Sequence, residues 1–117
     1  MEKRTYLCCL LDIYGALLTE RQRALLEQQL YEDCSLFEIS EREGITRQAV
    51  RDALMRAERE LISAEEKIGF FSYSEQVKSA VRGVEQAAAP FASKDEGGEL
   101  AEKLNCLKEL TEVGHGI

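Results

Sequence analysis

The sequence predicts an all-α protein: a helix-turn-helix domain with an extended recognition helix, followed by one or two further helices. Three observations predict this class. Most segments are rich in Leu, Glu, Gln, Arg and Ala, which favour helix, and the 117 residues include one proline and no tryptophan. Apolar residues recur at helical spacing along most of the chain. Residues 35–57 place two hydroxyl caps and a glycine where two closely linked helices would begin and end.

Two helices are expected ahead of this motif. The first covers residues 3–15, and Gly15 loosens its end. The second runs to about residue 31 and begins after Thr19, whose hydroxyl can serve as its N-cap. Apolar side chains at helical spacing mark the buried sides of these two helices: Leu7, Leu10, Leu11, Tyr14, Leu25, Leu26 and Leu30.

The helix-turn-helix itself is predicted from its caps. Ser35 caps a short helix over residues 36–43, and Glu38 completes a capping box with it. Gly44 then ends that helix with positive φ, which glycine adopts at little cost. Thr46 caps a second helix that begins at Arg47. The alternative interpretation is a tight corner between two helices with no role in recognition. The core between the helices is expected to contain Leu36, Ile39, Ile45, Val50 and Leu54.

The second helix of the motif is predicted to continue to about residue 68. Its apolar residues recur at intervals of four and three, which is a heptad seam. The seam consists of Val50, Leu54, Ala57, Leu61, Ala64 and Ile68. Such a seam must be buried against another element. Two interpretations stay open: a homodimer formed through this seam, or packing against other helices of the same chain.

The remainder of the chain divides into two pieces. A bend is expected at Gly69, followed by a helix that starts at Ser72 or Ser74 and ends near residue 89, ahead of Pro90. Residues 87–98 indicate a linker, and residues 99–113 an amphipathic helix that docks or seeks a partner. We therefore expect a helix-turn-helix domain over residues 1–89, without a wing, and a linker with a C-terminal extension over residues 90–117.

The charge is wrong for a protein that binds nucleic acid by bulk electrostatics. The net charge is −7, from 15 basic and 22 acidic residues. Residues 46–84 are the one region with a small basic surplus, seven basic against six acidic side chains, whereas residues 19–45 carry three basic and seven acidic ones. The predicted recognition helix opens that region. Any nucleic-acid contact is therefore expected to be local, and to need a dimer or a partner for affinity.

Several classes of function are not expected. The four cysteines lack the spacing of a zinc site, and His115 falls in a tail that we expect to be frayed. No carboxylate pair has a neighbour suited to acid–base catalysis, so we predict no enzyme, no metal and no cofactor. The first apolar run is too short for a signal peptide or a membrane span. The sequence predicts a cytoplasmic protein that does not engage the membrane.

Residues 17–22, 35–40 and 44–50 resemble the YlxM family of small bacterial helix-turn-helix proteins. Their order and spacing match over about residues 5–85, and the piece beyond Pro90 looks like an extension outside the shared pattern. The motif also resembles the promoter-reading domain of sigma factors. The resemblance implies an all-helical cytosolic protein that takes part in the signal recognition particle pathway, in association with that particle's GTPase.

By analogy with sigma-type readers, four residues would face DNA: Thr46, Arg47, Gln48 and Arg51. Glutamine can pair with adenine and arginine with guanine in the major groove, and Thr46 can hold a phosphate at the helix N-terminus. This predicts a DNA-binding regulatory protein. The alternative hypothesis is an acidic protein-interaction module that binds the signal recognition particle GTPase and does not bind DNA directly.

Overall fold

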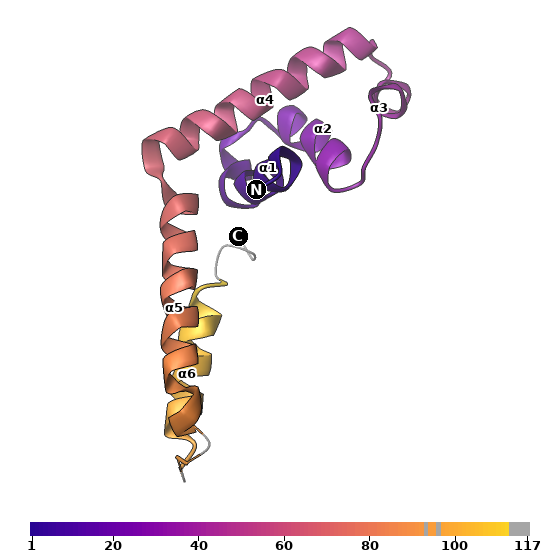
Figure 1. The fold of residues 1–117 in the computed structure, drawn as a ribbon. Helices are drawn as coiled ribbons and strands as arrows, with labels where there is room; N and C mark the ends of the chain where they lie inside the picture. The colour runs from indigo at the N-terminus through magenta and orange to yellow at the C-terminus, as the bar shows by residue number, and fades with distance from the viewer. Residues whose placement is uncertain (93, 96, 113–117) are drawn as a thin grey trace. The chain divides into compact units, whose positions relative to one another are not determined.

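The computed structural model describes residues 1–92, 94–95 and 97–112. Helices account for most of this part of the chain, and no strand occurs in it, which confirms the predicted all-α class (Figure 1). By packing, the chain divides into two units, residues 1–69 and residues 70–117. The helices are α1 (Lys3–Tyr14), the 3₁₀ turn η1 (Gly15–Leu17), α2 (Glu20–Leu30), α3 (Leu36–Glu43), α4 (Arg47–Ile68), α5 (Phe70–Ala92) and α6 (Glu99–Leu110).

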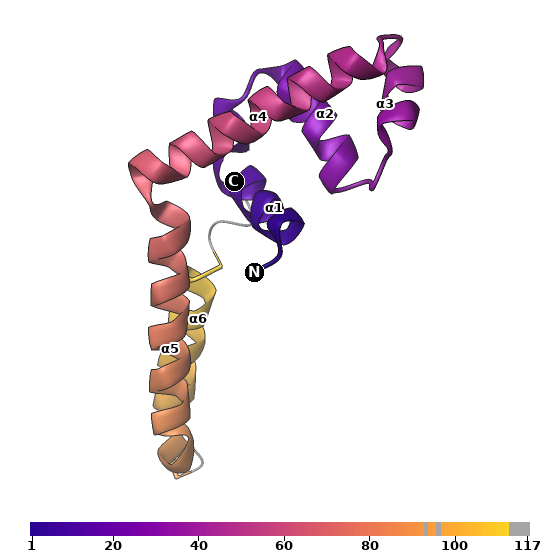
Figure 2. The same cartoon turned by 45° about the horizontal axis from the view of Figure 1, so that its top comes forward.

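The first unit is organised around α4. Helices α1, α2 and α3 all pack against α4, with α3 at its N-terminal end (Figures 1 and 2). Each contributes leucine or isoleucine side chains to one core, and burial of each such side chain is worth about 1.5–3 kcal/mol. The largest fully buried side chains are Leu10, Leu11, Leu25, Leu26, Ile39, Leu61 and Val50.

The predicted seam of α4 is buried within the chain itself. Val50, Ala57 and Leu61 are 0% exposed. Leu54 and Ala64 are buried as well. A homodimer through this seam is therefore the wrong interpretation, because the chain's own helices α1, α2 and α3 already cover it. Only the last position, Ile68, is exposed, at 62%, since it lies one turn beyond the buried part of the seam.

The helix boundaries around the motif lie where the sequence predicts them. The Ser35 hydroxyl accepts a hydrogen bond from the backbone N–H of Glu38, and the Glu38 carboxylate accepts one from the N–H of Ser35, both at 3.1 Å. Thr19 forms the same reciprocal box with Gln22 at the start of α2. Each cap satisfies helix N–H groups that have no partner within the helix. The caps therefore fix where α2 and α3 begin.

Gly44 ends α3 in the left-handed conformation, with φ of 67°. No atom lies within 4 Å of the place where a Cβ would stand, so a side chain there would meet backbone strain and no clash. We expect Gly44→Ala to lower the free energy of unfolding by about 1–2 kcal/mol. Gly44→Asn is the control, since asparagine tolerates this conformation better. Urea unfolding checks this, and an equal loss in both variants would contradict it.

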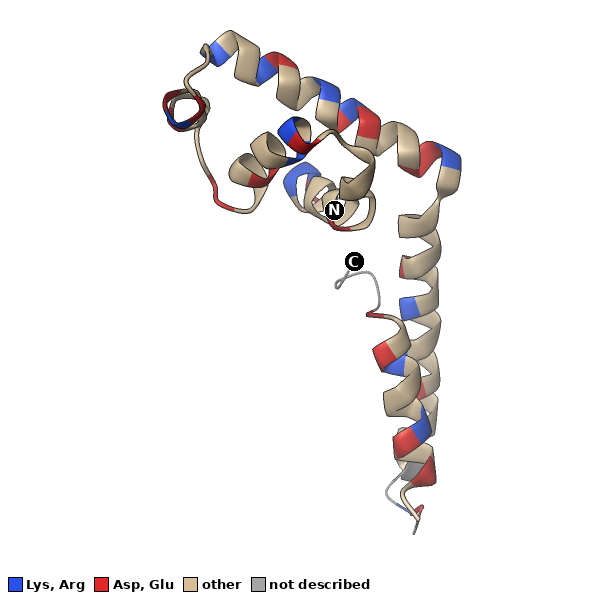
Figure 3. Ribbon diagram, turned by 180° about the vertical axis from the view of Figure 1, so that it is seen from behind, with Lys and Arg blue, Asp and Glu red and all other residues tan. Residues whose placement is uncertain are grey.

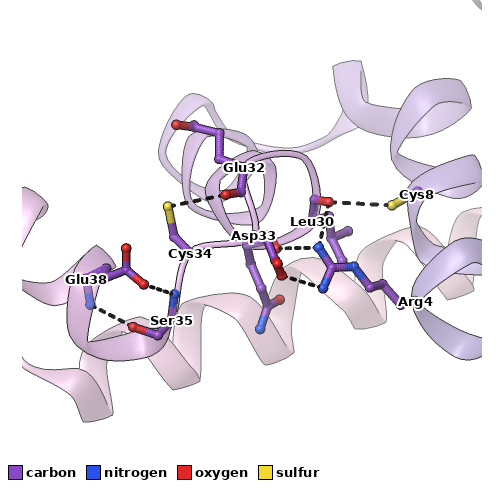
Figure 4. Close-up of polar contacts among 9 residues, drawn as sticks. Arg4, Cys8, Leu30, Glu32, Asp33, Cys34, Ser35 and Glu38 are labelled. Atoms are coloured by element: carbon purple, nitrogen blue, oxygen red, sulfur yellow. Dashed lines mark hydrogen bonds and ion pairs between the residues drawn. The ribbon is translucent and has the colours of Figure 1, made fainter.

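The turn between α2 and α3 is tied to α1 by Arg4 (Figure 4). Arg4 Nη1 donates to Asp33 Oδ1 at 2.7 Å, and Nη2 donates to the carbonyl oxygen of Leu30 at 3.2 Å. Asp33 itself has φ of 57°, a conformation that aspartate visits more readily than most residues. The hydrogen bond and charge of Asp33 raise the pKa of the Arg4 guanidinium. This tether places the start of α3, and so the whole motif, relative to α1.

A second polar contact joins α1 to the end of α2. The Tyr31 hydroxyl donates to the Asp12 carboxylate. Burial of the hydroxyl, followed by the hydrogen bond and charge of Asp12, raises the pKa of Tyr31. Tyr31 therefore ionises at higher pH in the folded chain than in the unfolded chain, where tyrosine has a pKa of about 10. The stabilisation is complete below that pH and is lost as the pH rises toward the folded-state pKa.

The raised pKa of Tyr31 can be tested by unfolding the protein at alkaline pH. Tyr31→Phe should be less stable than the wild type near neutral pH, because it lacks the hydrogen bond to Asp12. The difference should narrow above a pH of about 10, where the unfolded wild-type chain gains from ionising its tyrosine. Urea midpoints of both proteins between a pH of about 8 and about 11 measure it. A difference that stays constant over this range would contradict the contact.

The second unit pairs α5 with α6. Helix α5 begins at Phe70, earlier than the predicted Ser72 or Ser74, because Gly69 ends α4 in a single left-handed residue, with φ of 71°. The Ser74 hydroxyl donates back to the carbonyl oxygen of Phe71 at 2.9 Å and so lies inside the helix. Helix α5 also continues through Pro90, since one missing N–H in a last turn that follows three alanines leaves the helix intact.

These helix limits change the division of the chain. The predicted linker over residues 87–98 shrinks to the turn between α5 and α6, and the predicted boundary between residues 89 and 90 falls inside α5. The division by packing follows Gly69 instead, because α5 pairs with α6. Helix α6 confirms the predicted amphipathic helix up to Leu110. Val113, where that helix was predicted to end, and His115 lie outside the described residues.

Candidate nucleic-acid interface

Helices α3 and α4, joined at Gly44, form the predicted helix-turn-helix. All four residues predicted to face a partner are exposed: Thr46, Arg47, Gln48 and Arg51. They occupy the N-cap and first turns of α4, at the end of the helix that lies beside α3 (Figure 1). The first unit therefore leaves this end of α4 accessible, as recognition of another macromolecule requires.

Thr46 acts first as a structural cap. Its side-chain oxygen accepts a hydrogen bond from the backbone N–H of Ala49 at 3.0 Å. This fixes the first turn of α4 and orients the remaining N–H groups of that turn outward along the helix axis. A helix N-terminus arranged in this way can meet a phosphate oxygen. The cap role of Thr46 is thus established, and its contact with a phosphate stays a prediction.

Arg47 leans back toward α3. Its guanidinium carbon lies 5.1 Å from the centroid of the Phe37 ring, within the range of a cation–π contact. Phe37 is 52% exposed, so the stack is on the surface. One signal in the sequence points to Phe37: it is a large aromatic residue on the solvent side of an otherwise amphipathic helix. The contact links the two helices of the motif and holds the charge of Arg47 close to the corner.

Gln48 and Arg51 differ in how they are held. Gln48 Nε2 donates to Asp52 Oδ1, one helical turn later in the chain, at 2.9 Å. This hydrogen bond fixes the orientation of the Gln48 amide. Arg51 takes part in none of the ion pairs among the described residues. Of the four predicted residues, Arg51 thus has the side chain most available to an outside acceptor.

The exposed face of α4 also carries Met55, which sequence reasoning missed. Gln48, Asp52 and Met55 follow at intervals of four and three residues, opposite the buried seam. Met55 is 45% exposed although it is apolar. Its exposure could have been deduced from its position, because Met55 is not one of the heptad seam positions on the helix that carries the motif. An apolar side chain on such a face can contact the methyl group of thymine.

The charge at this interface is balanced. Residues 36–56 contain four basic and four acidic side chains, and α4 shows bands of both signs along its length (Figure 3). Two of the charged groups on α3 are engaged internally. Gln28 Nε2 donates to Glu43 Oε1 at 2.8 Å, and Arg42 pairs with Glu32 at 3.1 Å. The surface therefore lacks the broad basic patch of proteins that bind nucleic acid by charge alone.

Other kinds of site find no support in the described part of the chain. Those residues hold no group of three or more His, Cys, Asp or Glu side chains placed to bind a metal ion. None of their helices is both long and apolar enough to cross a membrane.

Comparisons with known proteins agree with this geometry. Residues 1–97 match the model of the UPF0122 family, described as "Putative helix-turn-helix protein, YlxM / p13 like". The family is thus described by its helix-turn-helix and not as a family of enzymes. A UPF0122 protein of Desulforamulus reducens is 43% identical over 106 residues, which cover 85% of this chain and 91% of that protein.

Two further relatives show the same likeness. A UPF0122 protein of Clostridium kluyveri is 36% identical over 104 residues, covering 89% of this chain and 93% of that protein. One from a Thermoanaerobacter species is 35% identical over 112 residues, covering 96% and 91%. The family model and these matches extend beyond Pro90, so the prediction that the shared pattern ends there is wrong. The chain belongs to the UPF0122 family of YlxM/p13-like helix-turn-helix proteins.

Proposed function

We propose that this protein binds double-stranded DNA through α3 and α4 and acts as a cytoplasmic regulatory protein. The observation that supports this most is the exposure of the first turns of α4 at a capped, glycine-closed corner. In helix-turn-helix proteins the N-terminal residues of the second helix contact base edges in the major groove. The same part of α4 presents glutamine, arginine and methionine here.

Each exposed side chain has a proposed role. Arg51 donates to a guanine edge or a phosphate, and Gln48 pairs with adenine after releasing Asp52. Arg47, stacked on Phe37, contacts the phosphate backbone beside α3. Thr46 keeps its cap and places the first-turn N–H groups against a phosphate.

The balanced charge sets the expected strength of binding. A surface with as many acidic as basic groups gains little from displacing counterions, so non-specific affinity should be low and should depend weakly on salt. Binding should therefore depend on sequence-specific contacts. We expect selection from a random duplex library at low salt to enrich one family of sequences. Fluorescence anisotropy on the enriched duplex, with a scrambled duplex as control, measures the preference. No enrichment over the starting library would contradict the proposal.

A second candidate function rests on the acidic part of the first unit. Residues 19–45 carry seven acidic and three basic side chains, and Glu20, Glu38 and Glu41 are exposed there. Such a surface favours fast encounter with a basic partner. We propose that it docks a component of the signal recognition particle, namely its GTPase.

The two candidates separate in one experiment. Capture of the purified GTPase by this protein should weaken steeply with salt and should be abolished by Glu20→Lys with Glu41→Lys, while Arg51→Ala leaves it unchanged. The two variants should have the opposite effects on DNA binding: Arg51→Ala should weaken it, and Glu20→Lys with Glu41→Lys should not abolish it. Lack of capture at low salt would remove the second candidate without affecting the first.

A further inference from the structure

The second unit has little core of its own. Among the described residues of α5 and α6, Val81 is the one buried apolar side chain, and α6 has none. Two helices of this length need a buried apolar face to be stable in water. The pairing of α5 with α6 therefore leaves the unit incomplete.

Helix α5 carries two stripes, and α6 pairs with α5 on the side of one of them. That stripe has half-buried or buried side chains spaced by three and four residues, and one of its members, Glu85, forms an ion pair with Lys108 of α6 at 3.1 Å. Its members are Phe71, Ser74, Lys78, Val81, Glu85 and Ala88. Polar groups make up half of it, as expected for the side of a helix that faces a small, partly hydrated partner.

The second stripe, here called the open stripe, is fully apolar. Its spacing of three and four residues holds without a break over three heptads. Tyr73 is 63% exposed, Val84 51% and Phe91 65%. The open stripe consists of one half-buried residue, Val77, and six exposed ones, Phe70, Tyr73, Ala80, Val84, Ala87 and Phe91. Only four of the 23 residues of α5 are charged, against ten of the 22 in α4, and α5 is drawn mostly tan in Figure 3.

We propose that the open stripe is a homodimer interface, in which α5 of one chain packs along α5 of a second copy. A strict heptad repeat fits the same repeat on another helix, because both keep their apolar positions in line over the same length, about 33 Å here. The alanines in the middle of the stripe let two helix backbones approach closely.

The residues that flank the open stripe favour a second copy over a charged partner. The positions beside a heptad seam usually carry charges that select or reject partners. In α5 these positions hold Ser74, Gln76, Val81, Gly83, Ala88 and Pro90, all uncharged. Two identical helices therefore approach without like-charge repulsion, and no charge recruits an unlike partner. Two α5–α6 hairpins joined in this way form a four-helix bundle, with the core that one hairpin lacks.

The test is sedimentation velocity on the full-length protein at tens of micromolar. The wild type should sediment with a mass near twice the 13.2 kDa of one chain. Val84→Glu should raise the dimer dissociation constant at least about a hundredfold, because each partner would bury a carboxylate. Since Val84 is half exposed in the single chain, the substitution itself disrupts no packing there, and circular dichroism should show that the helices of the first unit stay folded.

Gln86→Glu is the matched control. It adds the same charge two residues away, at an exposed position outside the open stripe, and should leave the dimer intact. A monomeric wild type, a Val84→Glu variant that dimerises as tightly as the wild type, or equal weakening by both substitutions would overturn the proposal. The inference is independent of DNA binding, since a dimer that binds no DNA would leave it standing.

Discussion

Leu61→Ala is expected to lower the free energy of unfolding by about 2–5 kcal/mol, the largest effect of any single substitution proposed for this chain. Leu61 is 0% exposed in the middle of the α4 seam, where α1 and α2 pack against that helix. Truncation removes buried methyl groups and leaves a cavity that the surrounding helices fill only in part. Urea unfolding followed by circular dichroism, at one fixed protein concentration, measures the loss.

Ile68→Ala is the matched control, because it truncates another position of the same predicted seam. Ile68 is 62% exposed, so its loss should change stability by no more than about 0.5 kcal/mol. Comparing the stability losses of Leu61→Ala and Ile68→Ala distinguishes a seam that is buried within one chain from a seam that pairs two chains. Similar losses in both variants would mean that the seam is buried along its whole length by something other than α1, α2 and α3.

Arg51→Ala is expected to weaken binding to the selected duplex by about 1–3 kcal/mol, or roughly 5- to 150-fold. The reason is that Arg51 is exposed on the first turns of α4 and is held by none of the ion pairs among the described residues. Affinity for a scrambled duplex should change much less. Anisotropy titrations of both duplexes give the two numbers.

Arg59→Ala provides the control for charge. It removes one arginine from the exposed face of the same helix, two turns further along. A residue that far from the N-terminal turns lies beyond base contact, so the selected duplex should bind within about threefold of the wild type. Equal losses in Arg51→Ala and Arg59→Ala would show that α4 contributes general charge and does not read sequence.

The first unit was largely predictable because its local signals agree with its packing. The caps at Thr19, Ser35 and Thr46 and the glycine at position 44 each fix a helix end by a short-range hydrogen bond or a backbone conformation. Such ends depend on a few neighbouring residues and can be deduced from sequence. The seam of α4 could be recognised by its period, but the period alone does not say whether the covering helix belongs to the same chain.

The second unit shows where local rules are too weak. Pro90 disfavours helix in the residue before it, yet α5 continues to Ala92. Ser74, a good cap, instead donates to the carbonyl oxygen of Phe71 within the helix. In both places the residue's own preference against continuing the helix costs little free energy, and the helix-forming residues on either side outweigh it.

The candidate interface was predicted in position and missed in detail. The exposure of Thr46, Arg47, Gln48 and Arg51 follows from their place at the end of a capped helix. The stack of Arg47 on Phe37 and the exposure of Met55 do not, because they depend on how α3 crosses α4 and on which α4 face is covered. These are tertiary properties that a periodic pattern in one helix leaves open.

The most direct test of the central claim is an NMR titration of the isotope-labelled protein with the selected duplex. If α4 enters the groove by its N-terminal turns, the backbone amides that shift should cluster at residues 46–55, with the side-chain signals of Gln48 and Met55 among them. The amides of residues 58–68 should stay in place. Shifts confined to α1 and α2, or a saturated complex in which residues 46–55 do not move, would contradict the proposed mode of recognition.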